Sequence, residues 1–222
     1  MIDLLYYLRF MISIATELSI PFGDIQLKGD LFIPDQAHSI ILFSHGSGNS
    51  RFSPRNSFIS DAMNRYGFAT LLIDLLTEDE VSLYENCFDI QLLADRLIAV
   101  TEYVHQFDET SDFSIGYFGA GTGAASAFKA ARKLDKLVGA IVCRGGRPDL
   151  VMQDLSFVHA PTLLLVGSLD SPVLLINQAS FNHLCCIRKI IEIDGASHLF
   201  EEEGKLDEVA RYAAAWFKKY LS

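Results

Sequence analysis

Positive charge is scarce in this sequence. The 222 residues include 18 lysines and arginines but 28 aspartates and glutamates, which gives a formal net charge of −10. We do not expect nucleic acid or an anionic membrane to be the main partner of such a chain, because both require a basic protein face.

Cysteine is also sparse. The four cysteines lack the paired spacing of a metal site, so no bound metal is expected. Cys185 and Cys186 are adjacent in the sequence, which is unfavourable geometry for a mutual disulfide. Reduced thiols in a cytoplasmic protein are therefore the expected state.

The apolar N-terminal segment, residues 1–15, is too short to cross a bilayer and is interrupted by Asp3 and Arg9. It also lacks a clear small-residue cleavage site, so it fits an export signal poorly. We expect residues 1–20 to form an arm or helix docked on one domain, residues 21–222, unless the true start is Met11. Repeats, low-complexity tracts and linkers are absent from the sequence.

The sequence does contain a regular alternation of buried strands and helices. Half of its residues are hydrophobic and 21% are charged, as is usual for a globular domain. Continuous apolar runs predict strands buried on both faces, and apolar residues at helical spacing predict the helices between them. Strands are expected at residues 39–44, 68–74, 114–118, 137–143, 161–167 and 188–193, with helices at about 55–66, 88–106, 173–184 and 206–221 and a further helix after residue 123.

This order predicts an α/β fold with a doubly wound, mostly parallel sheet that binds ligands at the carboxyl ends of its strands. Residues 23–34 alternate between apolar and polar, which predicts an antiparallel N-terminal hairpin at the edge of the sheet. We place the turn of that hairpin at Lys28–Gly29–Asp30.

Residues 114–125, SIGYFGAGTGAA, have the layout of a nucleophile elbow, a sharp strand-to-helix turn that exposes one side chain. Gly119 and Gly123 stand where a Cβ would clash across the turn. The nucleophile belongs between them, at position 121, but that residue is glycine. A dinucleotide-binding loop is the alternative, although the spacing of its glycines differs and no ribose-binding acid follows about 20 residues later.

Two further residues follow the elbow in the order that α/β-hydrolases use, which is nucleophile, acid and histidine. Asp170 lies 49 residues after position 121, and His198 lies 28 residues after Asp170, each behind an apolar run. His198 would act as the general base, and Asp170 would hold its imidazole in the required tautomer. The alternative for each is an ordinary loop histidine or a turn-forming aspartate.

An oxyanion hole is expected beside the elbow. One N–H group would come from Ser47 in the stretch His45–Gly48, and the other from Thr122, the residue after the elbow position. Because the donors are backbone groups, the hole does not depend on the nucleophile. A simple turn or phosphate-type loop remains an alternative for residues 45–48.

The sequence resembles the dienelactone hydrolase branch of the α/β-hydrolases over nearly everything after residue 20. The matching stretches are residues 45–56 (HGSGNSRFSPRN), 116–123 (GYFGAGTG), 144–150 (RGGRPDL) and 196–202 (ASHLFEE). The resemblance implies an α/β-hydrolase fold and a serine or cysteine nucleophile at position 121, with Asp170 as acid and His198 as base. It also implies activity on small esters or lactones without a cofactor. Gly121 departs from this pattern.

Three other side chains could replace the missing nucleophile. Thr122 is expected to turn away from the cleft, and nothing in the spacing aims Ser47 at the site. Cys143 ends a strand next to the elbow strand, so its sulfur could face the cleft, although a buried structural cysteine is the more common case.

Four arginines are expected near the carboxyl edge of the sheet, namely Arg51, Arg55, Arg144 and Arg147. In a protein of negative net charge, such a group suggests a cleft for a carboxylate or phosphate. The alternative is that these arginines brace loops through Asp149, Asp154 or Glu201–Glu203.

The sequence therefore predicts a dienelactone-hydrolase-like enzyme whose activity is weakened, lost or carried by an unusual group. A non-catalytic module that binds or senses a small anionic ligand is the alternative. Glycine at position 121 could also be an engineered substitution that traps a substrate. The sequence predicts neither the natural substrate nor the oligomeric state.

Overall fold

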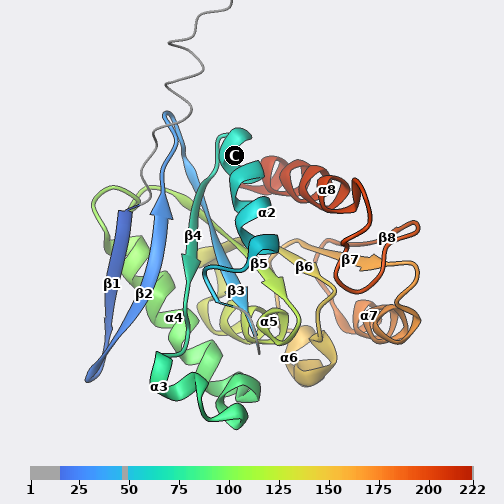
Figure 1. Ribbon diagram of the computed structural model, residues 1–222, viewed down its shortest axis with the longest axis horizontal. Coiled ribbons are helices and arrows are strands. Elements are labelled where there is room, and N and C mark those ends of the chain that lie inside the picture. Colours follow the sequence, from blue (N-terminus) through green and yellow to red (C-terminus); the bar gives the residue numbers. More distant parts are fainter. Residues whose placement is uncertain (1–15, 47–49, 222) are drawn as a thin grey trace, which may run out of the picture.

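The computed structural model describes residues 16–46 and 50–221 and contains one eight-stranded sheet with helices on both faces (Figure 1). The strand order is β1-β2-β4-β3-β5-β6-β7-β8; β2 pairs antiparallel with both β1 and β4, and every other pair is parallel. The strands are β1 (Thr16–Phe22), β2 (Ile25–Phe32), β3 (Ser39–His45), β4 (Ala69–Ile73), β5 (Ser114–Ala120), β6 (Val138–Arg144), β7 (Thr162–Gly167) and β8 (Arg188–Ile193). This is the α/β-hydrolase fold with its antiparallel edge hairpin, as the sequence predicted.

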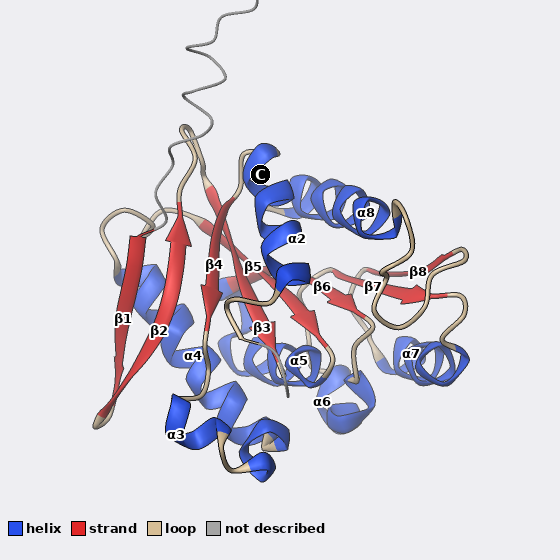
Figure 2. Cartoon of the chain, viewed as in Figure 1, coloured by secondary structure: helices blue, strands red, loops and turns tan. Residues whose placement is uncertain are grey.

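The longer helices form two layers around the sheet (Figure 2). They are α2 (Pro54–Arg65), α4 (Ile90–Gln106), α5 (Thr122–Leu134), α7 (Ser171–His183) and α8 (Lys205–Tyr220). Helices α2 and α8 pack on one face, and α4, α5 and α7 cover the other. No helix in residues 16–46 or 50–221 is both long and apolar enough to cross a membrane.

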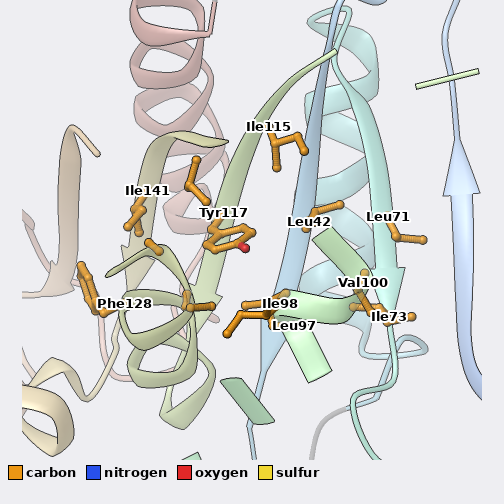
Figure 3. Packing of buried hydrophobic residues seen from close by; sticks show 14 of the residues in the cluster. Leu42, Leu71, Ile73, Leu97, Ile98, Val100, Ile115, Tyr117, Phe128 and Ile141 are labelled. Atoms are coloured by element: carbon orange, nitrogen blue, oxygen red, sulfur yellow. The ribbon is translucent and has the colours of Figure 1, made fainter. Parts of the chain in front are cut away.

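Burial on both faces explains why the central strands are continuously apolar, since every residue of β3, β4 and β7 is buried. Alternate residues face different cores. Leu42 packs with the α4–α5 side, whereas Phe43 packs with the α2–α8 side. Figure 3 shows the core on the α4–α5 side, around Tyr117. The Tyr117 hydroxyl lies 2.6 Å from Thr101 Oγ1. Burial raises the pKa of Tyr117, so this hydroxyl stays protonated and hydrogen-bonded.

The edge hairpin is present, but our placement of its turn was wrong. The turn is at Gly23 and Asp24, where Gly23 has φ +57°, and Gly29 lies inside β2. Gly29 pairs with Leu18 on one side and Ile73 on the other. A Cβ at Gly29 would lie 2.9 Å from the side chains of Ile73 and Leu71, so glycine is needed there for close strand packing.

Residues 16–20, which we assigned to an N-terminal arm, belong to β1 in this hairpin. The remainder of the expected arm, residues 1–15, lies outside the described residues. Short helices also lie in three of the stretches between the predicted strands and helices. They are α3 (Glu78–Val81), η1 (Tyr84–Phe88), η2 (Asp135–Leu137), η3 (Pro148–Val151) and α6 (Met152–Leu155).

A buried arginine anchors the segment between β4 and α4. Arg96 donates to both carboxylate oxygens of Glu80, at 2.5 and 2.7 Å, and to the carbonyl of Leu75 at 2.7 Å. These bonds lower the pKa of Glu80 from its usual 4.5 to about 2. The folded carboxylate is therefore favoured, and its contribution to stability is present above pH 4.5 and is lost as the pH falls towards 2.

We expect Glu80→Gln to lower the free energy of unfolding by about 2 kcal/mol at neutral pH, as is usual for hydrogen bonds to a charged group. The difference from the parent should shrink as the pH falls from 4.5 towards 2, because the parent then loses the same charge. Urea unfolding at several pH values measures the difference in the free energy of unfolding between parent and variant. Glu78→Gln, at an exposed site on the same short helix, is the control. It should change neither the free energy of unfolding nor its dependence on pH.

Candidate active site

Strand β5 runs into Gly121, which has φ +58° and ψ −129°, and α5 begins at the next residue. This is a left-handed conformation that side chains rarely adopt and that glycine adopts without strain. A Cβ built on Gly121 would have no heavy atom within 4 Å among the described residues beyond its chain neighbours. The turn therefore has the geometry of a nucleophile elbow, and a side chain at position 121 would project into open space.

The two flanking glycines allow the tight packing of this elbow. A Cβ at Gly119 would lie 2.6 Å from the Cα of Ala124, across the turn. A Cβ at Gly123 would lie 2.2 Å from the carbonyl oxygen of Ser44, at the end of β3. Both distances are too short for any side chain, so the expected role of these glycines is confirmed.

Asp170 and His198 lie together at the carboxyl edge of the sheet. Asp170 follows β7 and precedes α7, and His198 follows β8. The Nδ1 atom of His198 lies 2.6 Å from Asp170 Oδ2. Asp170 is largely buried, with its side chain 12% exposed, whereas the His198 side chain is 52% exposed. A carboxylate bound at Nδ1 fixes the tautomer that leaves Nε2 able to accept a proton.

The loop after β6 connects this pair with the elbow. The backbone N–H of Arg147 donates to the carbonyl of Gly121 at 3.0 Å. On the same loop, a Cβ at Gly145 would lie 3.8 Å from His198 Cε1, and a Cβ at Gly146 would lie 3.7 Å from the Gly121 carbonyl oxygen. Residues 145–147 therefore lie close to both the His198 ring and the elbow.

Of the two residues expected to form the oxyanion hole, only Thr122 lies within the described residues. Ser47 lies outside the described residues. Thr122 is buried at the start of α5, and a Cβ at Gly46 would lie 1.6 Å from its Oγ1. The Thr122 side chain thus packs against the loop after β3, and its backbone N–H belongs to the first turn of α5, where the helix dipole favours negative charge.

Cys143 lies under the site. Its side chain is fully buried, and its Sγ lies 3.8 Å from Asn177 Oδ1. Burial raises the pKa of the Cys143 thiol to about 12, so almost no reactive thiolate exists at neutral pH. The geometry fits the structural alternative for this cysteine and not a nucleophile. All four cysteines are unpaired.

Three of the four rim arginines, Arg51, Arg55 and Arg147, have guanidinium groups in contact with carboxylates. Arg51 contacts Asp30 at 2.8 Å, Asp74 at 3.2 Å and Glu17 at 3.2 Å. Arg147 forms two hydrogen bonds of 2.9 Å with the carboxylate of Asp149. The Arg147–Asp149 pair and the 3.0 Å Arg55–Glu201 pair are contacts that the loop-bracing alternative named, whereas Arg51 pairs with other carboxylates. We do not assign Arg51 or Arg147 to a ligand.

Arg144 is different, because it is 6% exposed and forms no ion pair with a described residue. One amino group, Nη2, reaches Asn56 Oδ1 in the first turn of α2 at 3.5 Å, while Nη1 is buried with no partner among residues 16–46 and 50–221. Burial, together with the positive charge of Arg55, lowers the pKa of Arg144 to about 10. Arg55 has an exposed partner, Glu201, at 3.0 Å. Arg144 and Arg55 are thus the two arginines whose surroundings could accept an anion.

Three residues that position the site were missed in the sequence. Asn177 on α7 donates to the carbonyl of Gly146 at 3.0 Å and so holds the loop beside the elbow. His45 Nε2 lies 3.5 Å from Asp74 Oδ1, so these two side chains meet where β3 and β4 end. The position of His45 and Asp74 at the ends of two successive apolar runs was the available signal. Asn177 lies within a predicted helix, and nothing in the sequence pattern signalled its role.

The described part of the chain contains no group of three or more histidine, cysteine, aspartate or glutamate side chains that could hold a metal ion. Within the described residues, the site contains the His198–Asp170 pair and an elbow whose residue 121 has no side chain.

No family model matches the sequence. A crystal structure of dienelactone hydrolase from Anabaena variabilis is 44% identical and superposes with a TM-score of 0.92, over 94% of this chain and 98% of that chain. The esterase Est1E from Butyrivibrio proteoclasticus is 16% identical, with a TM-score of 0.77 over 91% of this chain and 98% of its own. The second likeness concerns the fold alone.

Two proteins from strains of Mycobacterium tuberculosis are each 44% identical over 205 residues, and both carry the provisional name of phosphoribosyl transferase. The match covers 92% of this chain but only 46% of either relative, so the chain spans about half the length of these curated relatives. The Anabaena structure, in contrast, is matched over nearly its full length at 44% identity. This chain therefore belongs to the dienelactone hydrolase family of the α/β-hydrolases.

Proposed function

We propose that the chain hydrolyses a small carboxylic ester or lactone, with low turnover because position 121 has no hydroxyl or thiol. The observation that carries this proposal is the 2.6 Å His198–Asp170 contact beside an open elbow. Loss of a triad serine lowers kcat by on the order of 10⁶ and leaves a residual rate that comes from the oxyanion hole and substrate binding. Here the start of α5 belongs to that residual machinery, His198 and Asp170 can activate another attacking group, and the chemistry needs no cofactor.

The roles of these groups follow from their positions. His198 Nε2 accepts a proton from the attacking group, and Asp170 stabilises the imidazolium that forms. The N–H groups at the start of α5 and in the loop after β3 stabilise negative charge on the substrate carbonyl oxygen. A chromogenic 4-nitrophenyl ester assay of the parent tests the proposal. Turnover above the buffer rate supports it, and its complete absence in a folded preparation contradicts it.

We also propose that the substrate carries an anionic group bound by Arg144 and Arg55. A buried guanidinium with an unpartnered Nη1 is costly, and a carboxylate or phosphate would supply the missing acceptor. The first turn of α2, which contains Arg55 and Asn56, adds a helix N-terminus that favours an anion.

If this is correct, benzoate should raise the melting temperature of the parent, since a ligand at 100 times its Kd stabilises a fold by about 2.7 kcal/mol. Arg144→Met should abolish the shift while leaving the fold intact, because an apolar side chain suits a buried position that lacks an ion pair. Arg147→Met, which removes an arginine already paired with Asp149, should keep the shift. A shift that survives in Arg144→Met would contradict the anion site.

A non-catalytic ligand-binding protein is the second candidate, and Gly121 is the observation that favours it. Such a protein would bind the ester saturably without turnover. Phosphoribosyl transfer is not proposed, because the chain matches 46% of the mycobacterial relatives and its site has the arrangement of acyl transfer.

A further inference from the structure

We propose that ester cleavage at this site occurs by direct attack of a water molecule held between Gly121 and His198, with no acyl-enzyme intermediate. This inference rests on the proposed hydrolase function and specifies its mechanism. In an elbow that carries serine, the hydroxyl lies between the turn and the imidazole and is the group that the base deprotonates. The question is what takes that place when position 121 is glycine.

The space at the elbow is suited to a water molecule. No described residue outside the chain neighbours of Gly121 lies within 4 Å of a Cβ built there. The His198 side chain is half exposed and its Nδ1 is occupied by Asp170, so Nε2 is the nitrogen that can accept a proton. No described residue beyond the chain neighbours of Gly121 blocks the position of the absent hydroxyl, and Asp170 already orients the imidazole that would activate a water molecule there.

The described side chains near the elbow do not offer a replacement nucleophile. Cys143 is fully buried, and its thiol has a pKa of about 12. The Thr122 hydroxyl packs against Gly46. Ser126 is a buried residue of α5, and its hydroxyl donates to the Gly123 carbonyl at 3.0 Å and lies 2.9 Å from Ser44 Oγ. Each of these groups is packed against described residues, whereas a Cβ built on Gly121 meets none within 4 Å beyond its chain neighbours.

The elbow is held in place without a side chain at its apex. The Gly121 carbonyl accepts hydrogen bonds from Arg147 at 3.0 Å and from Ala124 at 3.2 Å. The backbone that orients the first N–H groups of α5 is therefore fixed by residues outside position 121. Transition-state stabilisation at the carbonyl oxygen can persist although the nucleophile is absent.

The reaction is balanced with water as the only co-reactant. His198 Nε2 takes a proton from water while the water oxygen bonds to the ester carbonyl carbon, and the carbonyl π electrons move to its oxygen. The resulting oxyanion collapses, the bond to the leaving oxygen breaks, and the leaving alkoxide takes the proton from His198. The products are a carboxylic acid and an alcohol, and no bond to the protein forms at any stage.

A fluorophosphonate distinguishes this mechanism from a covalent one, because it modifies an activated nucleophile whichever step limits turnover. The parent should retain its 4-nitrophenyl ester turnover after prolonged treatment, and its intact mass should not change. Gly121→Ser is the matched positive control. It should lose its activity and gain one phosphonyl group, which peptide mapping should locate at residue 121.

A phosphonyl adduct on any residue of the parent, Ser47 and Cys143 included, together with loss of turnover would overturn direct water attack while leaving the hydrolase function in place. The absence of any turnover by the untreated parent would instead contradict the hydrolase function itself, and direct attack with it. The two failures are therefore distinguishable.

Discussion

Gly121→Ser should convert this protein into an efficient esterase. The new hydroxyl would project from the elbow into space that no described residue fills, beside a histidine already bound to its aspartate at 2.6 Å. Turnover of a 4-nitrophenyl ester should rise by several orders of magnitude, with about 10⁶-fold as the upper limit set by the effect of losing a triad serine. Steady-state kinetics of the parent and the variant measure the gain.

The same substitution should reduce stability. A non-glycine residue in the conformation of Gly121 costs about 1–3 kcal/mol. For a chain of this size each kcal/mol corresponds to about 2–4 °C in melting temperature, so a fall of roughly 2 to 12 °C is expected. Gly121→Ala is the matched control, because it imposes the same backbone strain without a hydroxyl. It should show the lower melting temperature and no gain in turnover.

Equal turnover in the folded Gly121→Ser and Gly121→Ala variants would show that the site lacks more than its nucleophile. The alternative of a ligand-binding protein would then be the better account.

His198→Ala should remove nearly all hydrolysis by the parent. General-base catalysis contributes about 10²- to 10⁴-fold. His198 has an aspartate at 2.6 Å from Nδ1 and a half-exposed ring, whereas His45, which lies 3.5 Å from Asp74 at the end of β3, is buried. In the Gly121→Ser background the loss should approach about 10⁶-fold, because serine and histidine act as a unit. The measurement is kcat/KM for one ester in the four combinations of these two positions.

His159→Ala provides a close control. His159 Nδ1 also lies 2.6 Å from a carboxylate, that of Asp135, but this pair follows α5 at the opposite end from the elbow. Turnover should be unchanged in this variant. Residual hydrolysis that is equal in His198→Ala and the parent would assign that hydrolysis to another group or to a contaminant.

The sequence predicted most of the fold because the signals were local. Runs such as residues 39–44 and 161–167 are apolar throughout, which only strands covered on both faces require. The elbow was also predictable, since its glycines are spaced by the geometry of a single turn. The Lys28–Gly29–Asp30 turn was misplaced because the need for glycine there comes from Ile73 and Leu71 on a strand more than 40 residues away.

The surroundings of the arginines could not be predicted for a similar reason. Arg51 is neutralised by Asp30 and Glu17 of the edge hairpin, which the sheet order brings to it from elsewhere in the chain. Arg144 has no such partner, and only the three-dimensional arrangement distinguishes these two residues. The place of Cys143 below Gly146, and not in the cleft, likewise depends on the direction in which one strand residue points.

The proposed mechanism requires His198, Asp170 and the elbow at residue 121 to meet at one point. Alkylation of Gly121→Cys by iodoacetamide as a function of pH, with the modified peptide identified by mass, tests this most directly. An imidazole within reach should lower the pKa of the introduced thiol well below the usual value of about 8.5, and adding His198→Ala should return it to that value. An introduced thiol that titrates near 8.5 in both proteins would show that the base does not reach the elbow.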